Sequence, residues 1–108
     1  MLEPGLDRHE WESEWQALEE QVADSPAESL GDLDDLVGRM LEARGYAIND
    51  PVAVEGEERD VVAEFRAARE TTQLVEAGST DISPGDVAAA VNGYRAVYET
   101  ILAESSAP

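Results

Sequence analysis

Apolar residues recur at intervals of three and four positions in four separate segments, and this periodicity constrains the fold more than any other feature. Such spacing places apolar side chains along one side of an α-helix. Ser, Asp, Pro and Gly, which start or stop helices, separate the four segments. The pattern predicts helices over about residues 7–23, 26–44, 57–77 and 84–103.

The first two predicted helices follow each other closely. Asp7 is predicted to cap the first, with Glu10 completing a capping box and Leu6 packing on the helix. Ser25 is predicted to cap the second, with Glu28 completing another box. Their predicted apolar faces consist of Trp11, Trp15, Leu18 and Val22 in the first helix, and Leu30, Leu33, Leu36, Val37, Met40 and Leu41 in the second.

Glycines mark the ends of the second and third predicted helices. Gly45 is predicted to end the second in a Schellman motif, with Tyr46 folding back on the helix, and Gly78 to end the third. Ser83 and Asp86 have the spacing of a capping box for the fourth. The predicted inner faces are Val61, Phe65, Ala68, Thr72 and Val75 in the third helix, and Val87, Val91, Tyr94, Tyr98 and Ile101 in the fourth.

The segment 46–56 lacks helical periodicity, and Asn49-Asp50-Pro51 favours a turn within it. It forms either a very short hairpin or an irregular loop that closes one end of the core. Four amphipathic helices with short connections predict an all-α, four-helix bundle-like fold. We expect one domain over 1–108, with residues 1–5 and 104–108 frayed.

The chain is strongly acidic, with a net charge of −18 and neither lysine nor cysteine. A GC-rich genome or salt adaptation each accounts for this composition. The charge argues against direct nucleic-acid binding and against anionic membranes. No apolar run approaches the roughly 20 residues of a membrane span, so a cytoplasmic location is expected. The missing cysteines exclude disulfides and thiolate metal sites.

No pattern in the sequence indicates catalysis. His9, with Glu12 one turn away, is interpreted as a surface residue and not as a metal ligand. No acidic residue falls clearly within an apolar stripe, so none is expected to have the perturbed pKa that acid–base catalysis needs. Tyr94 and Tyr98 are interpreted as core residues, with a pocket lining as the alternative. The sequence therefore predicts no enzyme, no cofactor and no metal.

The outer face of the last predicted helix is unusual because its residues are small and uncharged. It consists of Ala89, Asn92, Gly93, Ala96 and Ala103. A helix with small or apolar residues all round is usually buried on more than one side. This face therefore forms a homodimer or partner contact, lies centrally in its own monomer, or reflects alanine's helix propensity. If it forms a dimer, Ala96→Glu is expected to yield monomers.

Two strings, Glu10-Trp11 through Gln21 and Gly93-Tyr94-Arg95-Ala96-Val97-Tyr98-Glu99, resemble small acidic helical proteins of high-GC Gram-positive bacteria, a group without an assigned function. The resemblance implies a bacterial cytoplasmic origin and a helical fold, and it carries over no functional residues. The sequence favours a non-enzymatic domain that self-associates or binds a protein partner. The alternatives are an acidic nucleic-acid mimic that binds a basic protein, and a ligand binder or enzyme with a pocket between helices.

Overall fold

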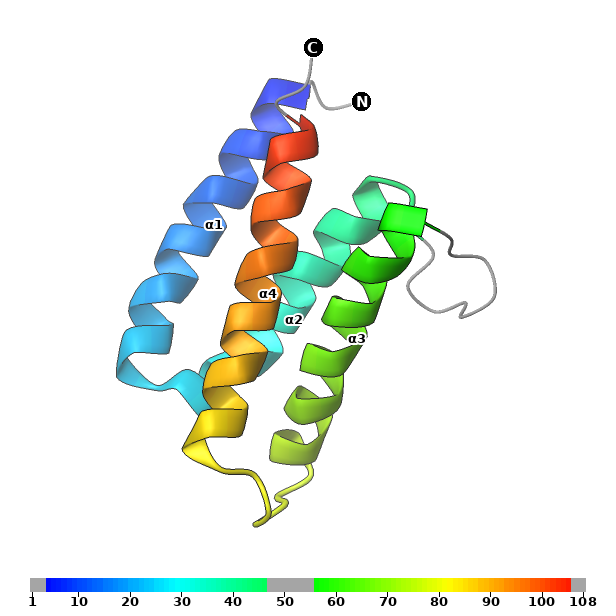
Figure 1. Cartoon of the computed structure of the whole chain (residues 1–108). Coiled ribbons are helices and arrows are strands. Elements are labelled where there is room, and N and C mark those ends of the chain that lie inside the picture. The colour runs from blue at the N-terminus through cyan, green and yellow to red at the C-terminus, as the bar shows by residue number, and fades with distance from the viewer. Residues whose placement is uncertain (1–3, 47–55, 106–108) are drawn as a thin grey trace.

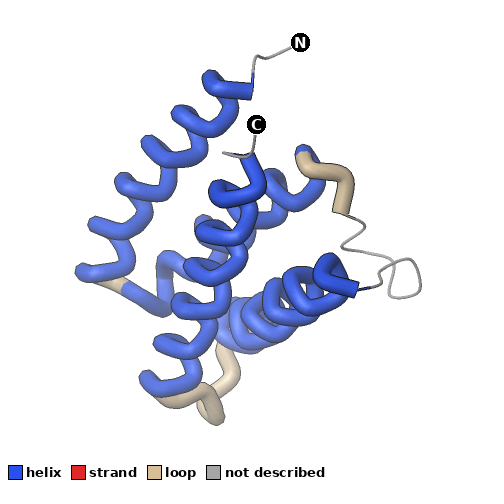
Figure 2. Tube along the Cα trace, turned by 45° about the horizontal axis from the view of Figure 1, so that its top comes forward, coloured by secondary structure: helices blue, strands red, loops and turns tan. Residues whose placement is uncertain are grey.

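The described part of the chain folds into four helices that run alternately down and up, as the computed structural model in Figure 1 shows. The structure describes the backbone of residues 4–46 and 56–105, and the side chains of residues 9–46 and 60–103. The helices are α1 (Pro4–Asp24), α2 (Pro26–Ala43), α3 (Gly56–Glu76) and α4 (Pro84–Ser105). Figure 2 shows helices and loops and no strand in the described part, so the all-α bundle prediction is confirmed.

Two details at the helix boundaries differ from the prediction or lie outside the described residues. Helix α1 begins at Pro4, so Asp7 lies within its first turn and the predicted cap at Asp7 is wrong. The Leu6 side chain lies outside the described residues, as do residues 47–55, on which the choice between hairpin and loop depends. Most of the ends predicted to fray also lie outside them.

Glycines end α2 and α3 as predicted. Gly45 and Gly78 have φ values of 86° and 80°, in the left-handed region that side chains with a Cβ rarely adopt. Beyond Gly45, the Tyr46 amide donates to the Leu41 carbonyl at 2.9 Å. The Ser79 amide donates to the Leu74 carbonyl at 3.0 Å in the same way. Both pairings are those of a Schellman motif, which satisfies carbonyls that a helix end leaves free.

The core lies where α2, α3 and α4 meet. All six predicted apolar residues of α2 are buried, as are all five predicted inner residues of α4. In α3, Val62 is buried whereas Val61, which we predicted to face inward, is only partly buried. The apolar face of α3 is broader than a single stripe because this helix packs on both α2 and α4. Leu74 remains 42% exposed.

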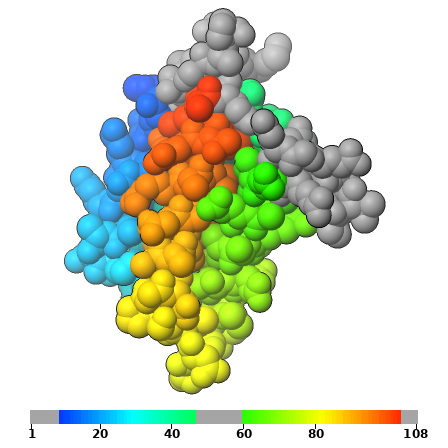
Figure 3. All heavy atoms as spheres, viewed as in Figure 1, coloured from blue at the N-terminus to red at the C-terminus, as the bar shows by residue number. Residues whose placement is uncertain are grey.

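Helix α4, like α2, contacts each of the other three helices. In Figure 3 it lies on the surface of the viewed face, between α1 and α3. Helix α1 packs mainly on α2 and reaches α4 through Trp15, whose ring stacks on Tyr98 with centroids 4.2 Å apart. The indole nitrogen of Trp15 donates a hydrogen bond to Glu19. Trp11, Leu18 and Val22, also predicted to face inward, are only partly buried.

Candidate functional site

A groove lies between the beginnings of α2 and α4, at the end of the bundle where α1 joins α2 and α3 joins α4. Pro26 and Pro84 each stand at the first position of their helix, where a missing N–H is tolerated. The groove has a volume of about 500 Å³. Its lining consists of Ser25, Pro26, Ala27, Glu28, Ile82, Ser83, Pro84, Val87 and Ala88.

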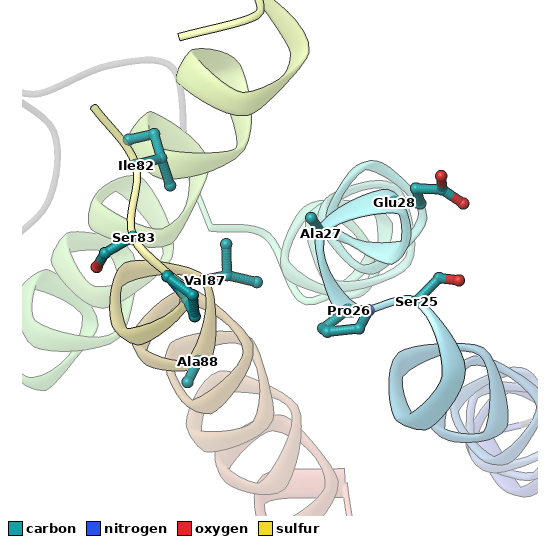
Figure 4. A pocket seen from close by; sticks show the side chains of 9 residues that line it. Ser25, Pro26, Ala27, Glu28, Ile82, Ser83, Val87 and Ala88 are labelled. Carbon is teal, nitrogen blue, oxygen red and sulfur yellow. The ribbon is translucent and has the colours of Figure 1, made fainter. Parts of the chain in front are cut away.

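Three apolar side chains border the space of the groove, and the polar groups of its lining point away from that space. In Figure 4, Val87 points into the gap between the two helices, and Ala27 and Pro26 stand opposite it. The carboxylate of Glu28 and the hydroxyls of Ser25 and Ser83 point away from the gap. The groove is therefore an apolar surface with a polar border, the usual composition of a binding cleft.

The two helices that form the groove are capped differently. At α4, the Asp86 amide donates to Ser83 Oγ at 3.1 Å, and the Ser83 amide donates to Asp86 Oδ2 at 3.0 Å. This confirms the predicted capping box. At α2, Ser25 is the N-cap residue but its side chain makes no capping hydrogen bond. The Ser25 amide donates to the Gln21 carbonyl of α1 at 2.7 Å, so it is not available to Glu28, and the second predicted box is wrong.

This end of the bundle is rich in carboxylates, and the sequence ranges that form it include no cationic residue. Residues 10–38 and 70–94 contain no Lys, Arg or His, and they include the last turns of α1 and α3 and the first turns of α2 and α4. The exposed carboxylates here are Glu20, Asp24, Glu28, Glu76, Asp81 and Asp86. We call this region, from Glu20 to Glu28 and from Glu76 to Ala88, the acidic end. The groove opens within it.

Two arginines, Arg39 and Arg95, lie close to carboxylates outside the acidic end. Arg39 of α2 donates to Glu14 of α1 at 2.7 Å and to Asp35, one turn earlier on α2, at 3.0 Å. Arg95 of α4 lies 3.9 Å from Glu19 of α1. These side chains are largely exposed, so each pair contributes at most about 1 kcal/mol. These arginines nevertheless neutralise some of the carboxylate charge between neighbouring helices. Among the described side chains, the acidic end has no such ion pairs.

A group of four polar side chains joins α2, α3 and α4 inside the bundle; we call it the polar network. Asp34 of α2 accepts two hydrogen bonds from the guanidinium of Arg69, both at 3.0 Å. The hydroxyl of Tyr94 donates to Asp34 Oδ2 at 2.9 Å and lies 2.6 Å from Thr72 Oγ1. The side chains of Asp34 and Arg69 are only 17% and 29% exposed, and Tyr94 is fully buried.

The donors in the polar network can be assigned by counting protons. An ionised carboxylate only accepts, so the single proton of Tyr94 points to Asp34. The proton of the close Tyr94–Thr72 contact must then come from Thr72. The Ala68 carbonyl, 3.0 Å from the same Thr72 hydroxyl, competes for that proton. The network therefore joins three helices through the hydroxyls of Tyr94 and Thr72 and the guanidinium of Arg69.

The surroundings of the polar network keep Tyr94 neutral and Arg69 charged at neutral pH. Burial raises the pKa of Tyr94 well above its ordinary value, and the nearby Asp34 carboxylate adds to this. Hydrogen bonds to Asp34 likewise raise the pKa of Arg69. Neither group can readily exchange a proton near pH 7, so the arrangement of Tyr94 and Arg69 favours a structural role over acid–base chemistry.

The position of Asp34 was detectable in the sequence but was missed. It follows Leu30 by four residues and precedes Val37 by three, so it lies within the buried stripe of α2. The expectation that no acidic residue falls within an apolar stripe is therefore wrong.

A polar cavity of about 260 Å³ lies beside the polar network and is lined by Gly31, Asp34, Arg69, Thr72, Gln73 and Glu76.

The five predicted interface residues of α4 do not share one environment. Ala89, Asn92 and Ala103 are exposed, Ala96 is partly buried, and Gly93 is buried. A Cβ on Gly93 would lie 3.4 Å from the Cβ of Ala68 on α3. The close backbone approach at Gly93 thus serves packing within the monomer, and self-association through the exposed members stays a prediction.

The other residues considered for chemistry are dispersed. His9 is exposed, as predicted. Among the side chains that the structure describes, no group of three or more His, Asp or Glu residues is arranged to hold a metal ion. None of the described helices combines the length and apolar character needed to cross a membrane. Trp15, Tyr94 and Tyr98 are buried in the core, which confirms their interpretation as packing residues.

No protein-family model, curated protein or solved structure gives a significant match to this chain. The functional argument therefore depends on geometry and charge.

Proposed function

We propose that this protein is a non-enzymatic interaction domain that binds a positively charged segment of a protein partner at its acidic end. The observation that carries the proposal is the segregation of charge. Glu28 borders the groove on α2 and Asp81 directly precedes the lining residue Ile82, while residues 10–38 and 70–94 supply no cation. A surface of one sign attracts partners of the opposite sign and speeds their association.

Several features support binding over catalysis. The polar network commits Asp34, Arg69 and Tyr94 to one another, which leaves none of them disposed to act on a substrate. The same carboxylates repel phosphate, so the proposal includes no direct contact with nucleic acid. We further propose a cytoplasmic location, where basic protein segments are abundant.

A binding measurement on matched charge variants tests the proposal. Glu28→Gln with Asp81→Asn removes two charges at the acidic end, whereas Glu10→Gln with Glu99→Gln removes two elsewhere. The probe is a fluorescent lysine-rich peptide. We expect the first pair to weaken binding by about 2- to 10-fold, and the second pair to weaken it much less. Equal losses would show that the peptide senses only net charge, which would contradict a local site.

Self-association through α4 is the second candidate function, favoured by the exposed small residues Ala89, Asn92 and Ala103. These residues carry no charge, so two copies can meet there with less repulsion than at the acidic end. Light scattering at increasing concentration tests this candidate. A dimer that Ala96→Glu converts to monomer supports it, and a wild-type protein that stays monomeric refutes it.

A further inference from the structure

We propose that the groove between α2 and α4 binds one apolar face of a cationic amphipathic helix, whose lysines or arginines pair with the surrounding carboxylates. This inference rests on the proposed function and names the kind of segment that the acidic end recognises. The groove supplies what charge alone does not, which is an apolar surface where a partner can bury side chains.

The size and lining of the groove suit aliphatic side chains. Its volume of about 500 Å³ lies in the range of typical ligand clefts, roughly 300–1,000 Å³. Val87 forms part of the lining and is largely buried, while Ile82 is partly buried and Ala27 and Ala88 are exposed. A partner that covers these residues removes apolar area from water, which is the main source of affinity in such contacts.

The form of the partner follows from what the groove lacks. An extended peptide usually binds by adding a strand to a sheet edge, and the described residues form no sheet. A polyproline segment usually docks against aromatic side chains, and none of the nine lining residues is aromatic. The remaining common mode is a helix that lays apolar residues at three- and four-residue spacing into a groove.

The charges around the groove determine the sign of that helix. Glu28 borders the groove on α2, and Asp24 directly precedes the lining residues of the α1–α2 junction. Asp81 and Asp86 stand next to the lining residues Ile82 and Val87. An acidic or neutral helix would leave these carboxylates without counter-charges, whereas a helix with basic flanks pairs with them. A second copy of this acidic chain is disfavoured for the same reason.

Three synthetic peptides of equal net charge serve as probes. In the first, leucines at three- and four-residue spacing form one face of a lysine-rich helix. In the second, serines replace the leucines. In the third, the leucines are redistributed around the helix. Binding is measured by fluorescence anisotropy to the full chain. We expect the first peptide to bind about tenfold more tightly than the other two, because it alone presents a continuous apolar face.

Two alanine variants locate the contact. Ala88 and Ala63 are both exposed, but only Ala88 lines the groove. Ala88→Gln places a polar side chain in the groove lining and is expected to weaken the first peptide's binding about tenfold. Ala63→Gln makes the same chemical change on α3, outside the groove, and is expected to leave affinity within about twofold. Circular dichroism confirms that both variants keep the fold.

The possible outcomes separate this inference from the proposed function. If all three peptides bind equally and Ala88→Gln has no effect, the groove inference is overturned while a charge-based interaction domain stands. If none of the cationic peptides binds, both fail. If Ala88→Gln, but not Ala63→Gln, dissociates a dimer of the protein itself, a second copy occupies the groove and the inference is overturned.

Discussion

Replacing Tyr94 with phenylalanine removes one hydroxyl from the polar network and leaves the ring in place. The lost hydroxyl donates to Asp34 at 2.9 Å and lies 2.6 Å from Thr72. A hydrogen bond to a charged acceptor contributes about 1.5–3 kcal/mol, and one between neutral groups about 1 kcal/mol. Asp34 keeps Arg69, and Thr72 keeps the Ala68 carbonyl, so neither is left without a partner. We therefore expect a loss of about 2 kcal/mol in the free energy of unfolding.

Urea unfolding followed by circular dichroism measures this loss. With a slope of about 1–3 kcal/mol per molar urea, the midpoint of Tyr94→Phe is expected to fall by about 1 M. A double-mutant cycle with Asp34→Asn isolates the coupling between the two groups, which we expect to be about 1 kcal/mol. A loss below about 0.5 kcal/mol, or no measurable coupling, would refute the assignment of the hydroxyl to Asp34.

A matched pair of threonine variants provides the control. Thr72→Val removes a buried hydroxyl that contacts both the Ala68 carbonyl and Tyr94. Thr100→Val removes an exposed hydroxyl that bonds the carbonyl four residues earlier, at 2.9 Å. Both substitutions replace a hydroxyl with a methyl group, and both hydroxyls bond the backbone carbonyl four residues earlier. We expect a cost of about 1–3 kcal/mol at Thr72 and within about 0.5 kcal/mol at Thr100.

Three further predictions follow from burial, close packing and capping. Folding raises the pKa of Tyr94 above its ordinary value of 10.0, so the neutral hydroxyl contributes its full share to the free energy of unfolding below about pH 10. Above that pH the free energy of unfolding is expected to fall by up to about 1.4 kcal/mol per pH unit. An alkaline titration in which all tyrosines ionise while the helices persist would contradict this. At Gly93, alanine fits beside α3 and is expected to stabilise by about 0.5–1 kcal/mol, whereas leucine overpacks and costs about 1–3 kcal/mol, as urea unfolding would show. Ser83→Ala is expected to cost about 1 kcal/mol in urea and Ser25→Ala much less, because only Ser83 caps through its side chain; equal losses would contradict the assignment.

Much of the fold was predictable because its signals are local. The stripe of α2, the glycines at 45 and 78 and the Ser83–Asp86 box each depend on residues within a few positions of one another. The box at Ser25 failed for a non-local reason. The junction between α1 and α2 is so short that the amide of Ser25 completes the last turn of α1. Spacing alone does not show which of two helices an amide serves.

The candidate site was less accessible to sequence reasoning because it joins distant segments. The groove brings Pro26 and Ala27 beside Val87 and Ala88, and the packing of α2 on α4 sets that placement. Asp34 was missed because acidic residues are so numerous in a chain of charge −18 that one more carboxylate is readily assigned to the surface. Its partner Arg69 follows the buried Phe65 by four residues on α3, and the guanidinium lies 4.5 Å from the centre of that ring. Asp34 and Arg69 carry opposite charges, and each lies at helical spacing from buried apolar residues of its own helix. This combination could have predicted that the two side chains pair.

The carboxylates of the acidic end are expected to destabilise the free protein and to stabilise its complex with a cationic partner. Added salt therefore has opposite expected effects on the melting temperature and on the binding affinity. In the free chain, carboxylates such as Glu28 and Asp81 repel one another without a nearby cation, so sodium chloride is expected to raise the melting temperature by screening them. In the complex, a cationic helix replaces that repulsion with attraction, so the same salt is expected to weaken binding. Glu28→Gln with Asp81→Asn should reduce both salt effects, whereas Glu10→Gln with Glu99→Gln should reduce them less. A melting temperature that falls with salt would mean that attraction in the arginine pairs outweighs repulsion at the acidic end, and the electrostatic reason for a cationic partner would fail.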